Sequence, residues 1–128
     1  MKGGWLSQKS IKKNVRTDNI EIGKNCKIAK HVYLDKHGIL KIGDNVTITS
    51  WVKILNHDAS DILTGKKHSE ITEIKDNAWI GLCSIILTGI TIGKNSIIGA
   101  GSVVTKDVPD REIWAGNPAK KIGIVQEE

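Results

Sequence analysis

Aliphatic residues recur at every sixth position through the C-terminal half of the chain. The series runs through Ile74, Ile80, Ile86, Ile92, Ile98 and Val104. Four residues after each aliphatic residue comes a small or β-branched residue. These are Ala78, Ser84, Ile90, Ser96, Ser102 and Val108. A period of six fits neither a helix nor the simple alternation of a flat strand. It fits short strands separated by corners, three of which close a triangular coil of about 18 residues.

The same phase is present in the N-terminal half. Two blocks of aliphatic residues repeat it: Ile22, Ile28 and Leu34, then Ile42, Ile48 and Ile54. The small-residue position is filled by Cys26, Val32, Val46 and Val52. Gly and Asn cluster at the expected corners, at 23–25, 43–45 and 93–95, where they supply backbone freedom. We therefore expect the aliphatic residues to fill the interior of one coil, and we disfavour a β-sandwich with accidental spacing.

The composition agrees with an all-β chain. It contains no Phe, 13 Gly and 21 Ile, and β-branched side chains favour extended strands. The length of 128 residues suits one domain. The sequence predicts a single parallel β-helix of hexapeptide repeats over residues 19–122, a short N-terminal segment at 1–18 and a C-terminal tail at 123–128.

Charge and cysteine content exclude several classes of function. The net charge of +5 comes mostly from scattered Lys rather than from a basic stripe with interleaved aromatic residues, which argues against nucleic-acid binding. No run approaches the roughly 18 apolar residues of a membrane span, so we expect no membrane insertion. Cys26 and Cys83 form no CxxC pair, and no leader peptide precedes them, so we expect a cytoplasmic protein.

The period slips at two places, and interruptions of a solenoid often carry function. The spacing from Ile22 to Ile42 is 20, a two-residue excess around positions 35–38. The spacing from Ile42 to Ile74 is 32, about 14 residues beyond one coil. We therefore predict one extended polar loop over about 58–73.

His57 stands immediately before the predicted loop and is the candidate catalytic base. A hydroxyl group is a poor nucleophile at neutral pH, and imidazole, with an unperturbed pKa of about 6.5, is suited to removing the proton of such a group. The alternative is that His57 is a solvated turn residue. Asp35, at the first slip, and Asn56, beside the base, are candidates for hydrogen bonds to acceptor hydroxyls. Asp58 begins the loop and is given no catalytic role.

The other histidines give weaker signals. His31 and His37 are six positions apart, and His68 lies in the predicted loop. A γ-class carbonic anhydrase has the same coil but needs a His-x4-His pair among its zinc ligands, and this chain has none. We therefore expect no metal.

Three motifs carry a family resemblance: Trp-Ile-Gly at 79–81, Ile-Gly-Ala-Gly-Ser-Val-Val-Thr-Lys-Asp at 98–107 and Ala-Gly-Asn-Pro-Ala-Lys at 115–120. They resemble the hexapeptide-repeat acyltransferases, in the sugar O-acetyltransferase branch with the galactoside, maltose and cell-surface polysaccharide acetyltransferases. The resemblance covers residues 19–122. It implies a left-handed coil, a homotrimer with active sites at the subunit seams, and acetyl-CoA as co-substrate. The implied reaction is direct O-acetylation of a sugar hydroxyl in glycan or polysaccharide biosynthesis.

The resemblance also implies a set of residues that bind the coenzyme: Trp79, Gly81, Ala100, Thr105, Lys106 and Lys120. Trp79 is placed near the acetyl end or the acceptor, and Lys120 near phosphate. Each has a structural alternative, because corner residues and turn glycines are required by the coil itself and lysines are usually exposed. Leu82 departs from the small residue that galactoside-type sequences often have at this position.

Two other functions remain open. N-acetylation of a nucleotide-linked amino sugar uses the same coil, but those relatives usually carry an N-terminal α/β domain, and none fits before residue 19. Serine as acceptor is disfavoured, because the polar stretch at 9–16 is too short for the helical domain of serine acetyltransferases. A non-catalytic assembly subunit would be expected to lack His57 or the Lys120 turn, and both are present.

Overall fold

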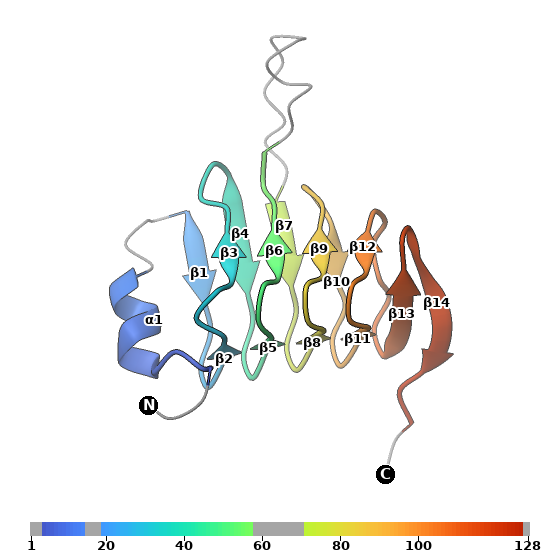
Figure 1. Ribbon diagram of the computed structural model, residues 1–128, viewed down its shortest axis with the longest axis horizontal. Helices are drawn as coiled ribbons and strands as arrows, with labels where there is room; N and C mark the ends of the chain where they lie inside the picture. Colours follow the sequence, from blue (N-terminus) through green and yellow to red (C-terminus); the bar gives the residue numbers. More distant parts are fainter. Residues whose placement is uncertain (1–3, 15–18, 58–70, 127–128) are drawn as a thin grey trace, which may run out of the picture.

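The computed structural model describes residues 4–14, 19–57 and 71–126. Short strands joined by corners wind around one long axis into a coil (Figure 1). The coil strands are β1 (Ile20–Ile22), β2 (Lys27–Ile28), β3 (Tyr33–Leu34), β4 (Ile39–Ile42), β5 (Thr47–Ile48), β6 (Lys53–Ile54), β7 (Ile71–Ile74), β8 (Trp79–Ile80), β9 (Ile85–Ile86), β10 (Thr91–Ile92), β11 (Ile97–Ile98) and β12 (Val103–Val104).

The coil strands pair in parallel and form three sheets, which are the three faces of a prism. Sheet I has the order β1-β4-β7-β10, sheet III has the order β12-β9-β6-β3, and sheet II contains β11-β8-β5-β2. Each strand pairs with the strand one full coil away, in a register that aligns the repeat. Ile28 pairs with Ile48, Ile48 with Ile80, and Ile80 with Ile98. This confirms the all-β, parallel coil that the period of six predicts.

The aligned aliphatic residues make up the core. Ile48, Ile80 and Ile98 are fully buried, and burying such a side chain contributes about 1.5–3 kcal/mol. The small-residue positions are buried as well, and their polar members are hydrogen-bonded. The hydroxyls of Ser84 and Ser102 both donate to the carbonyl of Gly99, at 2.9 and 2.6 Å. A buried hydroxyl is tolerated at these corners because a backbone carbonyl accepts its hydrogen bond, from the next coil for Ser84 and from the same corner for Ser102.

The corners use Asn and Gly for different physical reasons. Asn25, Asn45, Asn77 and Asn95 adopt positive φ near 60°, a region that Asn tolerates better than most residues. The glycines beside them do not adopt positive φ; they are needed where backbones approach closely. A Cβ on Gly93, for example, would lie 2.5 Å from the backbone nitrogen of Asp110. The expectation of backbone freedom is therefore confirmed for Asn and wrong for Gly93.

Both ends of the coil are covered by elements that the repeat does not predict (Figure 1). Helix α1 (Gln8–Asn14) packs the buried side chain of Ile11 onto the first coil, and the amide of Gln8 donates to the carbonyl of Cys26. At the other end β13 (Glu112–Gly116) pairs with β11 and forms an antiparallel hairpin with β14 (Ala119–Ile124). The hairpin extends two residues, Gly123 and Ile124, into the tail expected at 123–128.

Two of the three prism edges matter for function. We call the edge between sheets III and I the histidine edge; it comprises residues 35–38, 55–57, 87–90 and 105–107. The edge between sheets II and III is the glycine edge; it comprises residues 29–32, 49–52, 81–84 and 99–102.

Most of the predicted loop lies outside the described residues, but positions 71–73 belong to β7, so the loop ends earlier than expected. Within the described residues no helix has the length and apolar character to cross a bilayer.

Candidate active site

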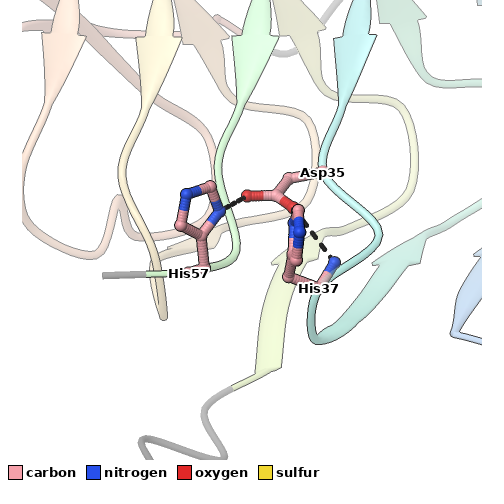
Figure 2. Close-up of side chains that lie close together, drawn as sticks. All are labelled: Asp35, His37 and His57. Carbon is pink, nitrogen blue, oxygen red and sulfur yellow. Dashed lines mark hydrogen bonds and ion pairs between the residues drawn. The ribbon is translucent and has the colours of Figure 1, made fainter. Parts of the chain in front are cut away.

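Two histidines and one aspartate meet on the histidine edge. Asp35 follows β3, His37 lies two residues later, and His57 follows β6 on the adjacent coil. Because β3 and β6 are paired in parallel, their corners lie side by side. Figure 2 shows the Asp35 carboxylate between the two imidazoles. The parallel coil thus brings together side chains that are about 20 residues apart in the sequence.

The Asp35 side chain is fully buried and accepts hydrogen bonds at both oxygens. Its Oδ1 accepts from the backbone N–H of His37 at 3.0 Å and from Nδ1 of the same residue at 2.5 Å. Its Oδ2 accepts from the backbone N–H of Asn56 at 3.0 Å and from Nδ1 of His57. A buried carboxylate is costly unless it is paired and hydrogen-bonded, and this one is both.

These hydrogen bonds also fix the charge of Asp35. Burial alone would raise the pKa of this carboxyl. The bonds from the backbone of Asn56 and His37 and from the two imidazoles outweigh burial and hold the pKa well below its ordinary value. An ionised carboxylate can only accept, so both imidazoles must carry their proton on Nδ1. In the neutral ring this leaves a lone pair on Nε2 of each histidine.

The base position on His57 is accessible. The His57 side chain is 51% exposed, and Nε2 has no hydrogen-bond partner among the residues that the structure describes. The hydroxyl of Thr88, on the next coil, donates to the His57 carbonyl at 2.8 Å and fixes the backbone there. His57 therefore has the geometry of a general base: one nitrogen is anchored, and the other is a free acceptor.

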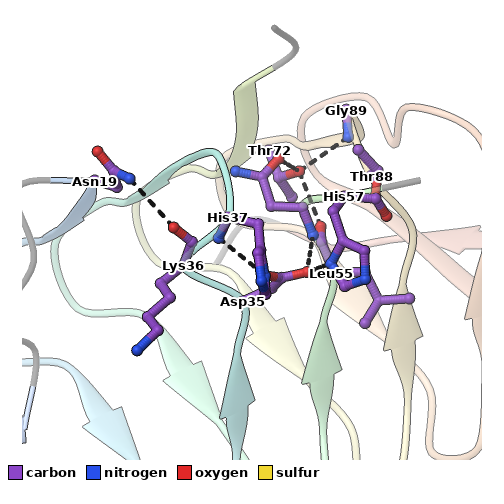
Figure 3. A network of polar contacts seen from close by, with 10 residues as sticks. Asn19, Asp35, Lys36, His37, Leu55, His57, Thr72, Thr88 and Gly89 are labelled. Atoms are coloured by element: carbon purple, nitrogen blue, oxygen red, sulfur yellow. Dashed lines mark hydrogen bonds and ion pairs between the residues drawn. The ribbon is translucent and has the colours of Figure 1, made fainter. Parts of the chain in front are cut away.

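A second layer of polar contacts supports the edge from behind (Figure 3). The Thr72 hydroxyl lies 2.9 Å from Oδ1 of Asn56 and accepts from the backbone N–H of Gly89 at 2.9 Å. Asn56 is only 4% exposed, and its Nδ2 is buried without a partner among the described residues. The sequence predicts that Asp35 and Asn56 bind the acceptor. Both side chains are buried beside His57, and their binding of the acceptor stays a prediction.

The same three side chains form a group of potential metal ligands. One ligand atom from each of Asp35, His37 and His57 lies within 4.8 Å of the others. The linear spacing of the histidines does not reveal this convergence, because it arises between coils. Both Nδ1 atoms are engaged as donors to Asp35, so this arrangement fits proton transfer.

The residues expected to bind coenzyme lie on several parts of the surface. Gly81 and Ala100 are on the glycine edge, where a Cβ on Gly81 would lie 2.6 Å from the Ala100 nitrogen. Trp79 is on the outer face of sheet II and is 42% exposed. The remaining three residues are exposed: Thr105 and Lys106 on the histidine edge and Lys120 on β14. One chain therefore does not bring Gly81 and Ala100 to His57.

A pocket on the glycine edge adjoins these residues. It has a volume of about 200 Å³, and its lining includes Trp5, Thr49, Ser50 and Leu82. The N-terminal segment forms one wall, because Trp5 bridges to Ala29 in antiparallel fashion. Leu82 is 47% exposed and gives this edge an apolar side chain beside Gly81.

Comparison with known proteins identifies the family. Residues 71–106 match the model described as bacterial transferase hexapeptide (six repeats). Protein CapG of Staphylococcus aureus is 42% identical over 94% of this chain and 78% of its own length. The chain belongs to the hexapeptide-repeat acyltransferases. Other relatives of this acyltransferase chain include galactoside O-acetyltransferases and serine acetyltransferases; it spans 53% of the galactoside enzyme from Escherichia coli.

Solved structures of the family agree with the architecture of this acyltransferase. A maltose O-acetyltransferase from Clostridium difficile 630 has a TM-score of 0.71 at 39% identity, covering 86% of this chain and 61% of that one. A hexapeptide-repeat acetyltransferase from Vibrio cholerae, solved in complex with acetyl-CoA, has a TM-score of 0.73 at 30% identity, covering 86% and 62%. The resemblance seen in the sequence motifs is confirmed.

His37 is the site residue that sequence reasoning missed. It carries no motif, and its spacing from the other histidines suggests nothing. The available signal was the two-residue excess in the repeat at positions 35–38, which places His37 against the carboxylate of Asp35.

Proposed function

We propose that the protein is an acetyl-CoA-dependent O-acetyltransferase that acts on a sugar hydroxyl, with His57 as general base. The observation that carries the proposal is the bond from His57 Nδ1 to the buried, ionised Asp35, which leaves Nε2 free to take a proton. Among the relatives, the galactoside and maltose O-acetyltransferases support a sugar as acceptor. We assign the activity to the cytoplasm and to the synthesis of cell-surface glycans or polysaccharides.

The proposed mechanism is direct transfer without a covalent enzyme intermediate. Nε2 of His57 takes the hydroxyl proton as the acceptor oxygen attacks the thioester carbonyl carbon. The carbon–sulfur bond then breaks, and the departing CoA thiolate receives the proton from Nε2. Asp35 stabilises the imidazolium that exists between these steps and keeps the ring in the correct tautomer. A thioester is already activated, so this scheme needs no metal.

We further propose that a second copy of the chain completes each site. His57 lies on the histidine edge, whereas Gly81 and Ala100 lie on the glycine edge of the same chain. A homotrimer of left-handed coils, as in the resembling family, brings the histidine edge of one subunit to the glycine edge of the next. The pantetheine arm then runs along that seam, beside backbone that Gly81 and Ala100 leave unobstructed.

The remaining coenzyme contacts follow from charge and exposure. Lys106 and Lys120 are exposed cations that suit the phosphate groups of the coenzyme, and Thr105, which precedes Lys106 in the chain, is assigned to the distal part of the arm. Trp79 offers an exposed aromatic face for the acetyl end or for a sugar ring. These assignments carry over from the family motifs and are proposals for this chain.

The decisive experiment measures thiol release from acetyl-CoA across a panel of sugars, for the wild type and for His57→Ala. We expect the wild type to acetylate at least one sugar, and we expect the variant to be slower by a factor on the order of 10²–10⁴, the usual cost of losing a general base. Lys94→Ala, on the third edge of the coil, serves as the control for handling and folding and should match the wild type.

The panel also includes an amino sugar, its nucleotide-linked form and serine. Transfer to nitrogen, or to serine in preference to every sugar, would replace the sugar O-acetyltransferase proposal with the corresponding alternative. Near-normal turnover by His57→Ala would disprove the base assignment. Absence of acetyl transfer by the wild type to all acceptors would favour a non-catalytic assembly subunit.

A further inference from the structure

The mechanism above uses one imidazole, but the Asp35 carboxylate holds two. His37 donates to Oδ1 through both its backbone N–H and its Nδ1, while His57 donates to Oδ2. The two rings lie 4.6 Å apart between centroids and are inclined at 57°. The His37 side chain is 60% exposed, so it is as accessible as the base itself.

The local backbone is built to hold His37 in this place. The two-residue excess at 35–38 lets the chain fold back so that the His37 N–H reaches Asp35. The next residue is Gly38, where a Cβ would lie 2.6 Å from Nδ2 of Asn56. A larger residue at 38 would push this turn away from the neighbouring coil, and His37 would move with it. The close packing at Gly38 therefore fixes His37 beside His57.

The chemical state of His37 follows from its partner. Since ionised Asp35 accepts from Nδ1, neutral His37 presents a lone pair on Nε2, and no partner takes it among the described residues. The site consequently shows two imidazole rings side by side, each with a free Nε2 and each anchored through Nδ1 on the same carboxylate. Two neighbouring acceptors are complementary to two neighbouring hydroxyl donors.

We propose that His37 is a specificity-determining residue that recognises a vicinal diol in the acceptor. One hydroxyl gives its proton to Nε2 of His57 and becomes acetylated, and the hydroxyl on the adjacent carbon donates to Nε2 of His37. The proposal rests on the proposed function and narrows its substrate class to sugars that present two adjacent hydroxyls. Acetylation then falls on a hydroxyl whose neighbour is also free.

The test uses matched acceptors: a glycoside with the adjacent hydroxyl and its monodeoxy analogue without it. Both are assayed at pH 8. We expect the wild type to prefer the diol by about tenfold in kcat/KM, the value of one hydrogen bond. In His37→Asn, the Asn amide can still donate to Asp35, but the Nε2 acceptor is gone. In His37→Asn, kcat/KM for the diol should fall to the value for the deoxy sugar. The value for the deoxy sugar should be the same in His37→Asn as in the wild type.

A structural role for His37 gives a different result, because disturbing Asp35 would slow both acceptors equally. Such an equal loss, or an unchanged preference for the diol in His37→Asn, overturns the proposal. So does a wild type that does not distinguish the two sugars. His37→Gln, whose amide reaches the Nε2 position, should keep part of the preference. Failure of the sugar proposal itself is recognised separately, since the wild type would then acetylate neither sugar.

Discussion

At the scale of single residues, one buried carboxylate organises the candidate site. Among the described residues no Lys or Arg pairs with Asp35. Hydrogen bonds from two imidazoles and two backbone N–H groups stabilise its charge instead. Its ionisation decides which nitrogen of each histidine carries the proton, and hence which nitrogen faces the substrate. Changes at this residue should therefore alter the chemistry before they alter the fold.

Replacement of Asp35 by Asn tests this dependence. The amide can accept at only one atom and presents a donor to the other imidazole, so one ring loses its anchor and its tautomer. We expect kcat to fall by a factor on the order of 10²–10⁴, with a smaller change in KM. Asp44→Asn is the matched control, because Asp44 accepts a single backbone N–H bond from Lys24 that an amide oxygen retains. If kcat of Asp35→Asn stayed near that of the wild type, Asp35 would have no role in the reaction.

The lowered pKa of Asp35 also predicts how stability depends on pH. A carboxyl whose pKa is lower in the folded state than in the unfolded state stabilises the fold above its unfolded value, about 3.9. That stabilisation is lost as the pH falls below about 4 and toward the folded value. In urea unfolding, the gap in stability between the wild type and Asp35→Asn should be full at pH 7 and should narrow below pH 4. A gap that is constant with pH would contradict the assignment.

At the scale of elements, the columns of aliphatic residues are the main source of stability. The inward position of each strand stacks on the same position one coil away, as Ile48, Ile80 and Ile98 do. Ile80→Ala should lower the free energy of unfolding by about 2–5 kcal/mol because it leaves a cavity in the column. The same substitution at Ile122, which is 66% exposed on β14, should cost less than about 1 kcal/mol. Chemical denaturation measures both, and equal losses would argue against the column as the core.

The elements also show how far the sequence predicts the structure. The register of β1–β12 follows from the period of six, because each inward residue must meet the equivalent residue of the next coil. Helix α1 and the β13–β14 hairpin are not predicted, because they cover the ends and lie outside the repeat. The meeting of His37 with Asp35 is not predicted either. It depends on how two extra residues fold against Gly38 and Asn56, a contact that linear spacing does not encode.

At the scale of the whole molecule, the two functional edges of one chain are separate. If the site forms between copies, two inactive variants should restore activity to each other. His57→Ala removes the base, and Ala100→Trp blocks the proposed path of the pantetheine arm. Mixed by unfolding and refolding at equal amounts, they should recover about a quarter of wild-type activity, since half of the subunits supply each intact edge and both must meet at one seam.

The control for this experiment is each variant refolded alone, which should stay inactive. A mixture that also stays inactive, although native mass spectrometry shows mixed trimers, would place the whole site within one chain. A monomer by light scattering would remove the seam altogether, because a single coil offers only one half of the proposed site.

The parallel register of the coil has a consequence for the evolution of the chain. Asp35 and His57 meet because their corners are one coil apart, so the loss of six residues between them would carry His57 to a different face and abolish the pair. A gain or loss of about 18 residues C-terminal to β7 would leave the pair intact and change only the length of the prism. Descendants of this gene should therefore vary in length by whole coils C-terminal to β7. Between Asp35 and His57, insertions and deletions should be confined to the corners.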